Sequence, residues 1–207
     1  MSKFWVLEEP DSADADRRHA EWNKDDIPRY ELIQCPINPG HRRAGAFLST
    51  ENVILPNVEP YDFVWPTWAC LVQGPVLELF RGAGFKGYDV APAIVRYARS
   101  ATKPPKFWQL IAKGSAGRPS LESGSRVLRV CPGCGLTDYS RILEPAKLID
   151  ESQWDGSDFF RVEPFLSRIF VIDRVVQALR HSRFEGWGAY SLEEMKEKFD
   201  IAVPGES

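Results

Sequence analysis

Two short turn sequences that carry cysteine constrain this chain more than any other feature. The first reads CPINPGH over residues 35–41, and the second reads CPGCG over residues 131–135. In the second, Cys131 and Cys134 bracket a Pro-Gly turn, which directs both sulfurs and several backbone N–H groups toward one point. That arrangement suits a tetrahedral zinc ion, with Zn–S distances of about 2.3 Å. The pattern predicts a zinc knuckle at Cys131 and Cys134.

A closed structural zinc site needs four ligands, and this knuckle supplies only two. Cys35 and His41 can supply the other two, because the prolines and the glycine between them also turn the chain. The predicted site is therefore Cys35, His41, Cys131 and Cys134. Residues 42–130 separate its two halves, so the metal would join distant segments of the chain.

Redox chemistry is the main alternative for a CxxC sequence. A thioredoxin-like motif lies between a strand and the start of a long helix. Residues 126–130 do read as a strand, but residues 135–140 read as a return strand or turn. A zinc-ribbon-like hairpin fits this order better than a redox motif.

The length and composition indicate one domain inside the cell. The chain has 207 residues, of which 43% are hydrophobic, enough for one sizeable core over residues 1–207. Within it, residues 30–50 and 125–142 would form a zinc-knuckle sub-lobe. A net charge of −3 argues against charge-driven binding to nucleic acid or to anionic membranes. The chain shows no signal-peptide pattern or membrane-length apolar run, and its four cysteines are too few for a disulfide scaffold, so we expect a cytoplasmic protein.

Local patterns predict many short elements and few helices. Apolar runs predict strands at residues 3–8, 30–34, 52–55, 107–112, 126–130 and 168–172. We expect helices over residues 91–100, 174–182 and 192–199, the last after a capping box that starts at Ser191. Residues 114–124, rich in Gly and Ser, predict a flexible loop. The whole indicates a loop-rich α+β fold with a mixed or antiparallel sheet, stapled by the zinc knuckle.

The common catalytic motifs built on histidine, serine or a glycine-rich loop are absent from the sequence. His19 and His181 lie outside any HExxH pattern, and neither GxSxG nor a phosphate-binding loop occurs. Four protein ligands would leave a zinc ion no open position for water, which favours structural metal. We therefore expect no enzymatic activity.

The order of these features resembles a known family. A cysteine turn follows an N-terminal strand at Cys35, and a proline-rich aromatic stretch leads to a Gly-Pro step at residues 74–75. A CxxCG sequence follows at residues 131–135, and residues 158–164 precede the strand at 168–172 and the helix after it. Most of the chain thus resembles the double-CXXCG motif family, small proteins first noticed as paralogues in myxobacteria. One departure is that the first motif, residues 35–41, is two residues longer than CXXCG and has His41 in place of the second cysteine.

The resemblance implies a function without catalysis. Members of that family are regarded as immunity proteins of contact-dependent polymorphic toxins. This chain would then be a cytoplasmic immunity protein that binds a cognate toxin domain and neutralises it by stoichiometric occlusion, with the acidic residues 11–26 and the 114–124 loop as candidate contacts. The alternative is a zinc-ribbon-like adaptor for nucleic acid or for a ribosomal or transcription partner. Arg126, Arg129 and Arg141 flank the knuckle, but the chain lacks a basic stripe.

Overall fold

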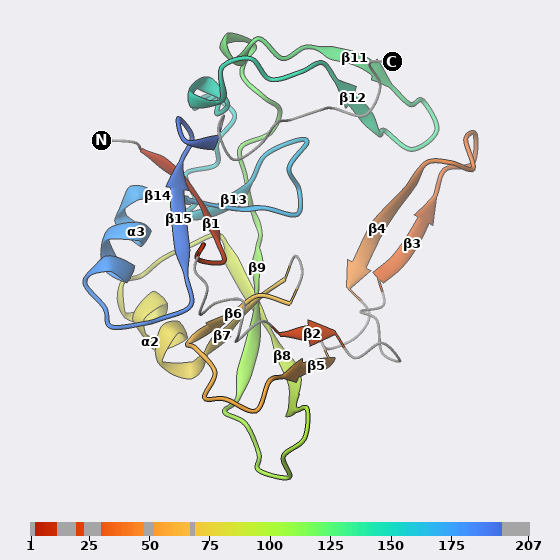
Figure 1. Cartoon of the computed structure of the whole chain (residues 1–207). Coiled ribbons are helices and arrows are strands. Elements are labelled where there is room, and N and C mark those ends of the chain that lie inside the picture. The colour runs from red at the N-terminus through yellow and green to blue at the C-terminus, as the bar shows by residue number, and fades with distance from the viewer. Residues whose placement is uncertain (1–2, 12–19, 23–29, 48–51, 67–68, 196–207) are drawn as a thin grey trace.

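Two mixed β-sheets, two isolated hairpins and two short α-helices make up the described part of the chain (Figure 1). The computed structural model describes residues 3–11, 20–22, 30–47, 52–66 and 69–195. This confirms the expected α+β fold, rich in short strands and loops. Within these ranges, no helix is both long enough and apolar enough to cross a bilayer.

The first sheet has five strands, and the N-terminal strand lies inside it. Strand β1 pairs antiparallel with β14 on one side and with β15 on the other. Val6 is fully buried on one face of β1 and Leu7 is 2% exposed on the other, so the strand carries an almost continuous apolar run. The order is β10 (Gly114–Ser115), β13 (Phe159–Arg161), β14 (Ile169–Ile172), β1 (Phe4–Glu8) and β15 (Gly188–Ser191), with β10 parallel to β13.

The second sheet has six strands built around the long strand β8. All neighbouring pairs in it are antiparallel except β5 and β8. The order is β2 (Glu21–Trp22), β5 (Asn52–Leu55), β8 (Tyr88–Tyr97), β9 (Phe107–Ala112), β7 (Cys70–Gln73) and β6 (Phe63–Val64).

Both helices cover the region where the two sheets meet. Helix α2 (Gly74–Gly82) carries proline in its first turn, where a missing N–H costs nothing, and α3 (Asp173–Arg180) follows β14 directly. Each helix buries one apolar face. The buried residues are Val76, Leu77 and Phe80 in α2, and Val175, Val176 and Leu179 in α3. Two 3₁₀ turns, Leu121–Ser123 and Pro145–Lys147, lie before and after the second cysteine hairpin.

The main core cluster joins both sheets to both helices. Phe159 of β13 is fully buried there, with its ring centroid 5.0 Å from that of Phe80 and 5.2 Å from that of Tyr88. An ion pair with a buried carboxylate lies beside it, because Asp158 is 2% exposed and accepts a 2.7 Å hydrogen bond from Arg174 Nη2, whereas the Arg174 side chain is half exposed. Asp158 also accepts a hydrogen bond from the Lys86 N–H, so its charge is well satisfied.

The predicted helix over residues 91–100 is wrong, because residues 91–97 belong to strand β8 (Tyr88–Tyr97) and the chain bends after it. Exposure alternates along β8 with the period of a strand, and Ile94 is 56% exposed. Pro92 fits because β9 pairs with it on one side, whereas the pairing with β5 begins only at Ile94. The missing N–H of proline therefore interrupts no bond between β5 and β8.

Three other local predictions have mixed outcomes. Residues 114–124 are not one flexible loop, since they contain β10 and a 3₁₀ turn. The helix predicted at 174–182 is confirmed as α3, but Asp173 lies in its first turn and Ile172 is the N-cap. The capping box is confirmed, because the Ser191 N–H donates to Glu194 and the Glu194 N–H donates to Ser191 Oγ. Half of the helix expected after it, residues 196–199, lies outside the described residues.

Candidate metal centre

The two cysteine turns are the tips of two separate hairpins. Residues 35–41 join β3 (Tyr30–Gln34) to β4 (Arg42–Phe47), and residues 131–136 join β11 (Val127–Val130) to β12 (Thr137–Tyr139). Each hairpin is a two-stranded antiparallel sheet that pairs with no other described strand. Figure 1 shows the two hairpins reaching toward each other from different parts of the molecule.

The four predicted ligands come together between these tips. One ligand atom from each of Cys35, His41, Cys131 and Cys134 lies within 4.8 Å of all the others. Cys35 Sγ lies 3.5 Å from Cys131 Sγ, and Cys134 Sγ lies 3.8 Å from His41 Nδ1. Bonds of about 2.3 Å at tetrahedral angles place neighbouring sulfurs about 3.8 Å apart. The geometry therefore fits a four-coordinate metal ion with three sulfur ligands and one nitrogen ligand.

Backbone hydrogen bonds hold both turns in similar shapes. The Cys35 N–H donates to the His41 carbonyl at 3.1 Å, and the Cys131 N–H donates to the Leu136 carbonyl at 2.8 Å. Within the second turn, the Gly135 N–H donates to the Cys131 carbonyl, and Gly135 has a φ of +71°, a conformation that glycine adopts without strain. Backbone hydrogen bonds alone thus close each cysteine turn, without a metal ion.

Nearby N–H groups favour the thiolate form at two of the sulfurs. Burial raises the pKa of Cys35, but N–H groups of Asn38 and Ile37, with smaller help from the other thiols, lower that pKa to about 7. The N–H groups of Gly133 and Cys134 lower the pKa of Cys131. Thiolates are the form that binds zinc, so this environment favours metal binding at neutral pH.

The pKa of Cys134 moves in the opposite direction. The Leu136 N–H lowers it, but burial and the neighbouring thiols Cys35 and Cys131 outweigh that effect and raise it. Three thiolates in one small space repel one another, and a divalent cation between them removes that repulsion. A divalent metal ion would therefore neutralise much of the combined negative charge of these sulfurs.

The first hairpin also packs directly on the second turn. A Cβ atom on Gly133 would lie 2.8 Å from Ile37 Cγ1 and 3.2 Å from Cys35 Sγ. A larger residue here would force the Ile37 side chain to shift, so close approach of the other hairpin favours glycine at this position. A CxxC pattern carries no information about what lies opposite, so the sequence could not predict this contact.

Side chains on β12 and in the segments next to the hairpin anchor it to the body of the protein. Tyr139 is 4% exposed, and its hydroxyl donates to Glu163 in the segment after β13. Burial and this carboxylate raise the pKa of Tyr139, so the phenol stays protonated. Ser140 accepts a hydrogen bond from the Arg126 N–H at 2.9 Å, which closes the base of the hairpin.

The surroundings of CxxC differ from those of a redox motif. The chain continues from Cys134 into strand β12, as expected, and not into a helix. The fourth cysteine, Cys70, lies away from this centre in the main core, where burial raises the pKa of its thiol. His181 lies just after α3 and bonds to the Gln177 carbonyl, whereas His19 lies outside the described residues.

Comparisons with known proteins do not assign the chain to a family. No family model matches the sequence, and no curated protein matches it. The resemblance to double-CXXCG proteins therefore continues to rest on the sequence features alone.

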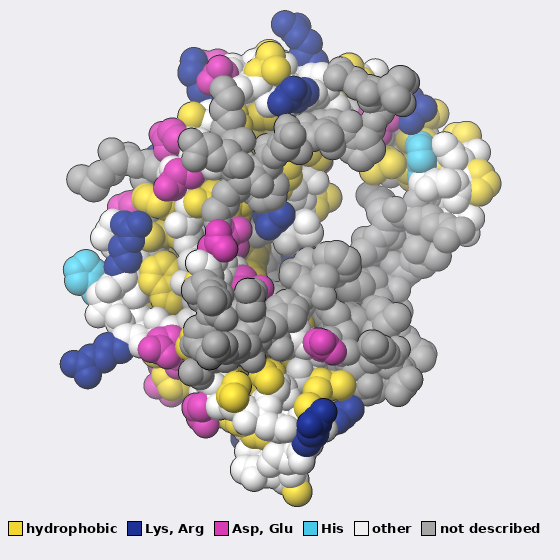
Figure 2. All heavy atoms as spheres, viewed as in Figure 1, with side chains coloured by type: hydrophobic (Ala, Val, Ile, Leu, Met, Phe, Trp, Pro, Cys, Tyr) yellow, Lys and Arg dark blue, Asp and Glu magenta, His cyan; other side chains and the backbone are white. Residues whose placement is uncertain are grey.

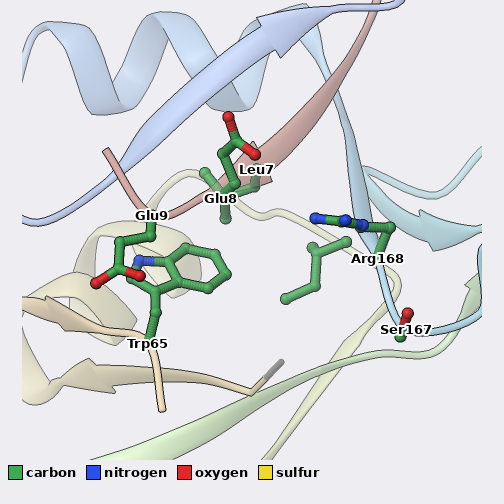
Figure 3. A pocket seen from close by; sticks show the side chains of 7 residues that line it. Leu7, Glu8, Glu9, Trp65, Ser167 and Arg168 are labelled. Atoms are coloured by element: carbon green, nitrogen blue, oxygen red, sulfur yellow. The ribbon is translucent and has the colours of Figure 1, made fainter. Parts of the chain in front are cut away.

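A separate pocket of about 320 Å³ lies between the ends of β1 and β14. Figure 3 shows Arg168 on one side of it, with Trp65 and Glu9 on the other. Glu8, Glu9 and Arg168 all interact with other groups of the protein, so a ligand would have to replace those contacts. Three segments far apart in the sequence form this pocket, so no local sequence pattern predicts it.

Proposed function

We propose that this chain is a binding protein with a structural zinc ion, and that its target is a toxin domain that it neutralises by occlusion. The observation that carries the zinc proposal is the convergence of three cysteines and one histidine within 4.8 Å. Sulfur and imidazole are the donors that zinc prefers, and four of them complete a tetrahedral site. Such a centre contributes rigidity and leaves no position for a substrate.

Exposed apolar side chains near the centre support a binding role. Ile37 and Leu128 are both 64% exposed, Val130 is 45% exposed and Leu136 is 37% exposed. All four lie on the two hairpins, and Figure 2 shows hydrophobic side chains at the hairpin tips. Clustered exposed apolar groups are typical of interaction sites. We therefore place the proposed binding surface on the hairpin tips.

The choice of a toxin as target comes from the order of sequence features shared with immunity proteins. Occlusion requires a rigid surface and no reacting group, which agrees with the absence of catalytic motifs in the sequence. Shape and charge complementarity would then set the specificity and the association rate. The proposed interface differs from the expected one, because it lies at the metal centre and not at residues 11–26 or 114–124.

A titration tests occlusion directly. The purified chain is added in steps to the toxin domain encoded by the neighbouring gene, and residual toxin activity is measured after equilibration. Occlusion predicts an end point close to equal molar amounts, independent of incubation time. Full protection at substoichiometric amounts, with progress over time, would instead indicate enzymatic inactivation and contradict the proposal.

Two surface substitutions test the position of the interface. Ile37→Asp at the tip of the first hairpin and Leu128→Asp on strand β11 of the second place a charge on the exposed apolar surface and should weaken toxin binding by at least about tenfold. Ile94→Asp is the matched control, because Ile94 is 56% exposed but lies on β8. Leu128→Asp and Ile94→Asp should keep the wild-type melting temperature, whereas Ile37→Asp also alters the contact with Gly133, so its melting temperature is measured alongside. Equal binding by all three would place the interface elsewhere.

The adaptor alternative has less support near the knuckle. Arg129 is bound to Asp138, with its Nη2 atom 2.7 Å from the carboxylate, so part of the basic charge there is already neutralised. Binding to generic RNA or DNA, measured at increasing salt, separates the two proposals. Steeply salt-dependent binding would favour the adaptor.

A further inference from the structure

Asn38 occupies the place in the first turn that Cys134 occupies in the second. Each is the third residue after the first cysteine of its turn, and each follows a proline-containing step. The Asn38 N–H lies 3.3 Å from Cys35 Sγ, and the Cys134 N–H likewise bonds to the sulfur of Cys131. The two turns thus share their backbone design, but the first has an amide side chain where the second has a ligand.

The Asn38 side chain binds the turn at two points. Its Oδ1 atom accepts a 2.9 Å hydrogen bond from the Gly40 N–H, and its Nδ2 atom lies 3.0 Å from His41 Nε2. The Asn38 carbonyl also accepts a 3.0 Å hydrogen bond from the His41 N–H. Asn38 therefore contacts both the backbone and the imidazole ring of the histidine that joins the cysteine cluster.

The ring orientation decides which nitrogen can serve the metal. His41 Nδ1 lies 3.8 Å from Cys134 Sγ, whereas Nε2 is engaged by Asn38. A neutral imidazole that binds through Nδ1 carries its proton on Nε2, and that N–H requires an acceptor. As placed, the amide presents its NH₂ group to Nε2, because Oδ1 is taken by the Gly40 N–H. Turning the amide over brings Oδ1 to the Nε2–H of the metal-binding tautomer and gives up the Gly40 hydrogen bond.

We propose that Asn38 is a positioning residue that holds His41 with Nδ1 toward the three cysteines. This inference rests on the proposed metal centre. Partners of the second ring nitrogen orient metal-binding histidines in many proteins, and their loss lowers metal affinity by about 10- to 100-fold. Asn38 reaches that nitrogen from the same turn, so the first hairpin carries both the ligand and its support.

The chemistry of the amide makes the proposal specific. In an Asn38→Asp variant, one carboxylate oxygen can accept from Gly40 N–H and the other from Nε2–H. A carboxylate accepts only, so it selects the tautomer with Nδ1 unprotonated and strengthens metal binding. Asn38→Leu keeps the size of the side chain but removes both hydrogen bonds, and it should weaken metal binding by about 10- to 100-fold.

The experiment measures the zinc affinity of the full chain by competition with a chromophoric chelator. It also records the visible spectrum of the cobalt(II)-loaded protein, which reports the ligand set. Asn38→Asp should bind zinc most tightly, wild type less tightly and Asn38→Leu least. The cobalt spectra of the first two should indicate three sulfur ligands and one nitrogen ligand. If all three proteins bind zinc equally, Asn38 does not position His41. If wild type binds no zinc, the metal centre itself is wrong.

A second background shows whether Asn38 acts through His41. In a His41→Ala chain, Asn38→Asp and Asn38→Leu should leave zinc affinity unchanged relative to His41→Ala alone. A rise in affinity caused by Asn38→Asp in this background would mean that the introduced carboxylate binds the metal directly, and would overturn the proposal. The comparison of Asn38→Asp with its parent in both backgrounds does not use the Asn38→Leu protein, so the proposal stays testable even if that variant folds poorly.

Discussion

Cys35 Sγ and Cys131 Sγ lie 3.5 Å apart although 96 positions separate them in the sequence. Each belongs to a hairpin whose strands pair only with each other among the described strands. An isolated two-stranded hairpin is only marginally stable in water. A metal ion held by both tips would therefore fix the β3–β4 hairpin in place by linking it to β11–β12.

Chelation of the metal should loosen the hairpins without unfolding the protein. Structural zinc contributes on the order of 10 kcal/mol of apparent binding energy in small modules, but this chain also has large buried clusters away from the centre. We expect a melting temperature lower by about 10 °C in EDTA. Amide exchange should accelerate at residues 35–41 and 131–136, and stay slow in β1 and β14. Complete unfolding by EDTA at room temperature would show that the core depends on the metal.

Replacing the central core aromatic should destabilise the whole fold. Phe159→Ala removes a fully buried ring that contacts Phe80 and Tyr88, and we expect a loss of about 3–5 kcal/mol in the free energy of unfolding. The measurement is urea denaturation followed by tryptophan fluorescence. Leu166→Ala is the control, because Leu166 is 56% exposed and should change stability by less than about 0.5 kcal/mol. A similar effect of both substitutions would mean that Phe159 is not a central contact.

The sequence predicted local features better than their long-range arrangement. The predicted strand at 107–112 agrees with β9 (Phe107–Ala112), because a short apolar run limited by prolines carries enough local information. The sequence also predicted which four residues come together, because cysteine and histidine in tight turns have few other uses. The β1–β15 pairing was not predicted, since it depends on contacts between the two ends of the chain.

The role of Asn38 was also outside what the sequence could predict. An asparagine in a turn commonly bonds to its own backbone, as Asn38 does with Gly40, and only the structure shows its second contact with His41. The error at residues 91–100 has a similar origin. The local sequence was read as a short helix, whereas pairing with β9 and β5 determines that residues 91–97 are a strand.

Acid should weaken the link between β10 and the segment before β13. Burial raises the pKa of Asp155, but hydrogen bonds from Ser157 and Ser115 outweigh it and lower the pKa below its usual value. The folded pKa is therefore below the unfolded value of about 3.9, so this stabilisation is present above that pH and is lost as the pH falls.

The matching measurement is the free energy of unfolding between pH 5 and pH 3, with EDTA present so that metal release does not contribute. Asp155→Asn should make that pH dependence shallower than in wild type. Asp89→Asn, which removes a carboxylate from an exposed position on β8, is the control for the loss of charge alone. A wild-type slope in the Asp155→Asn protein would contradict the role assigned to Asp155.

The zinc content of the purified chain decides whether the four residues form a metal centre. Elemental analysis should give one zinc per wild-type chain and per Cys70→Ser chain, because Cys70 lies buried in the main core. Cys131→Ser and Cys134→Ser should each lose most of the metal, and His41→Ala should lose less of it than either. Wild-type protein without zinc, or unchanged zinc in both Cys131→Ser and Cys134→Ser, would contradict the metal centre.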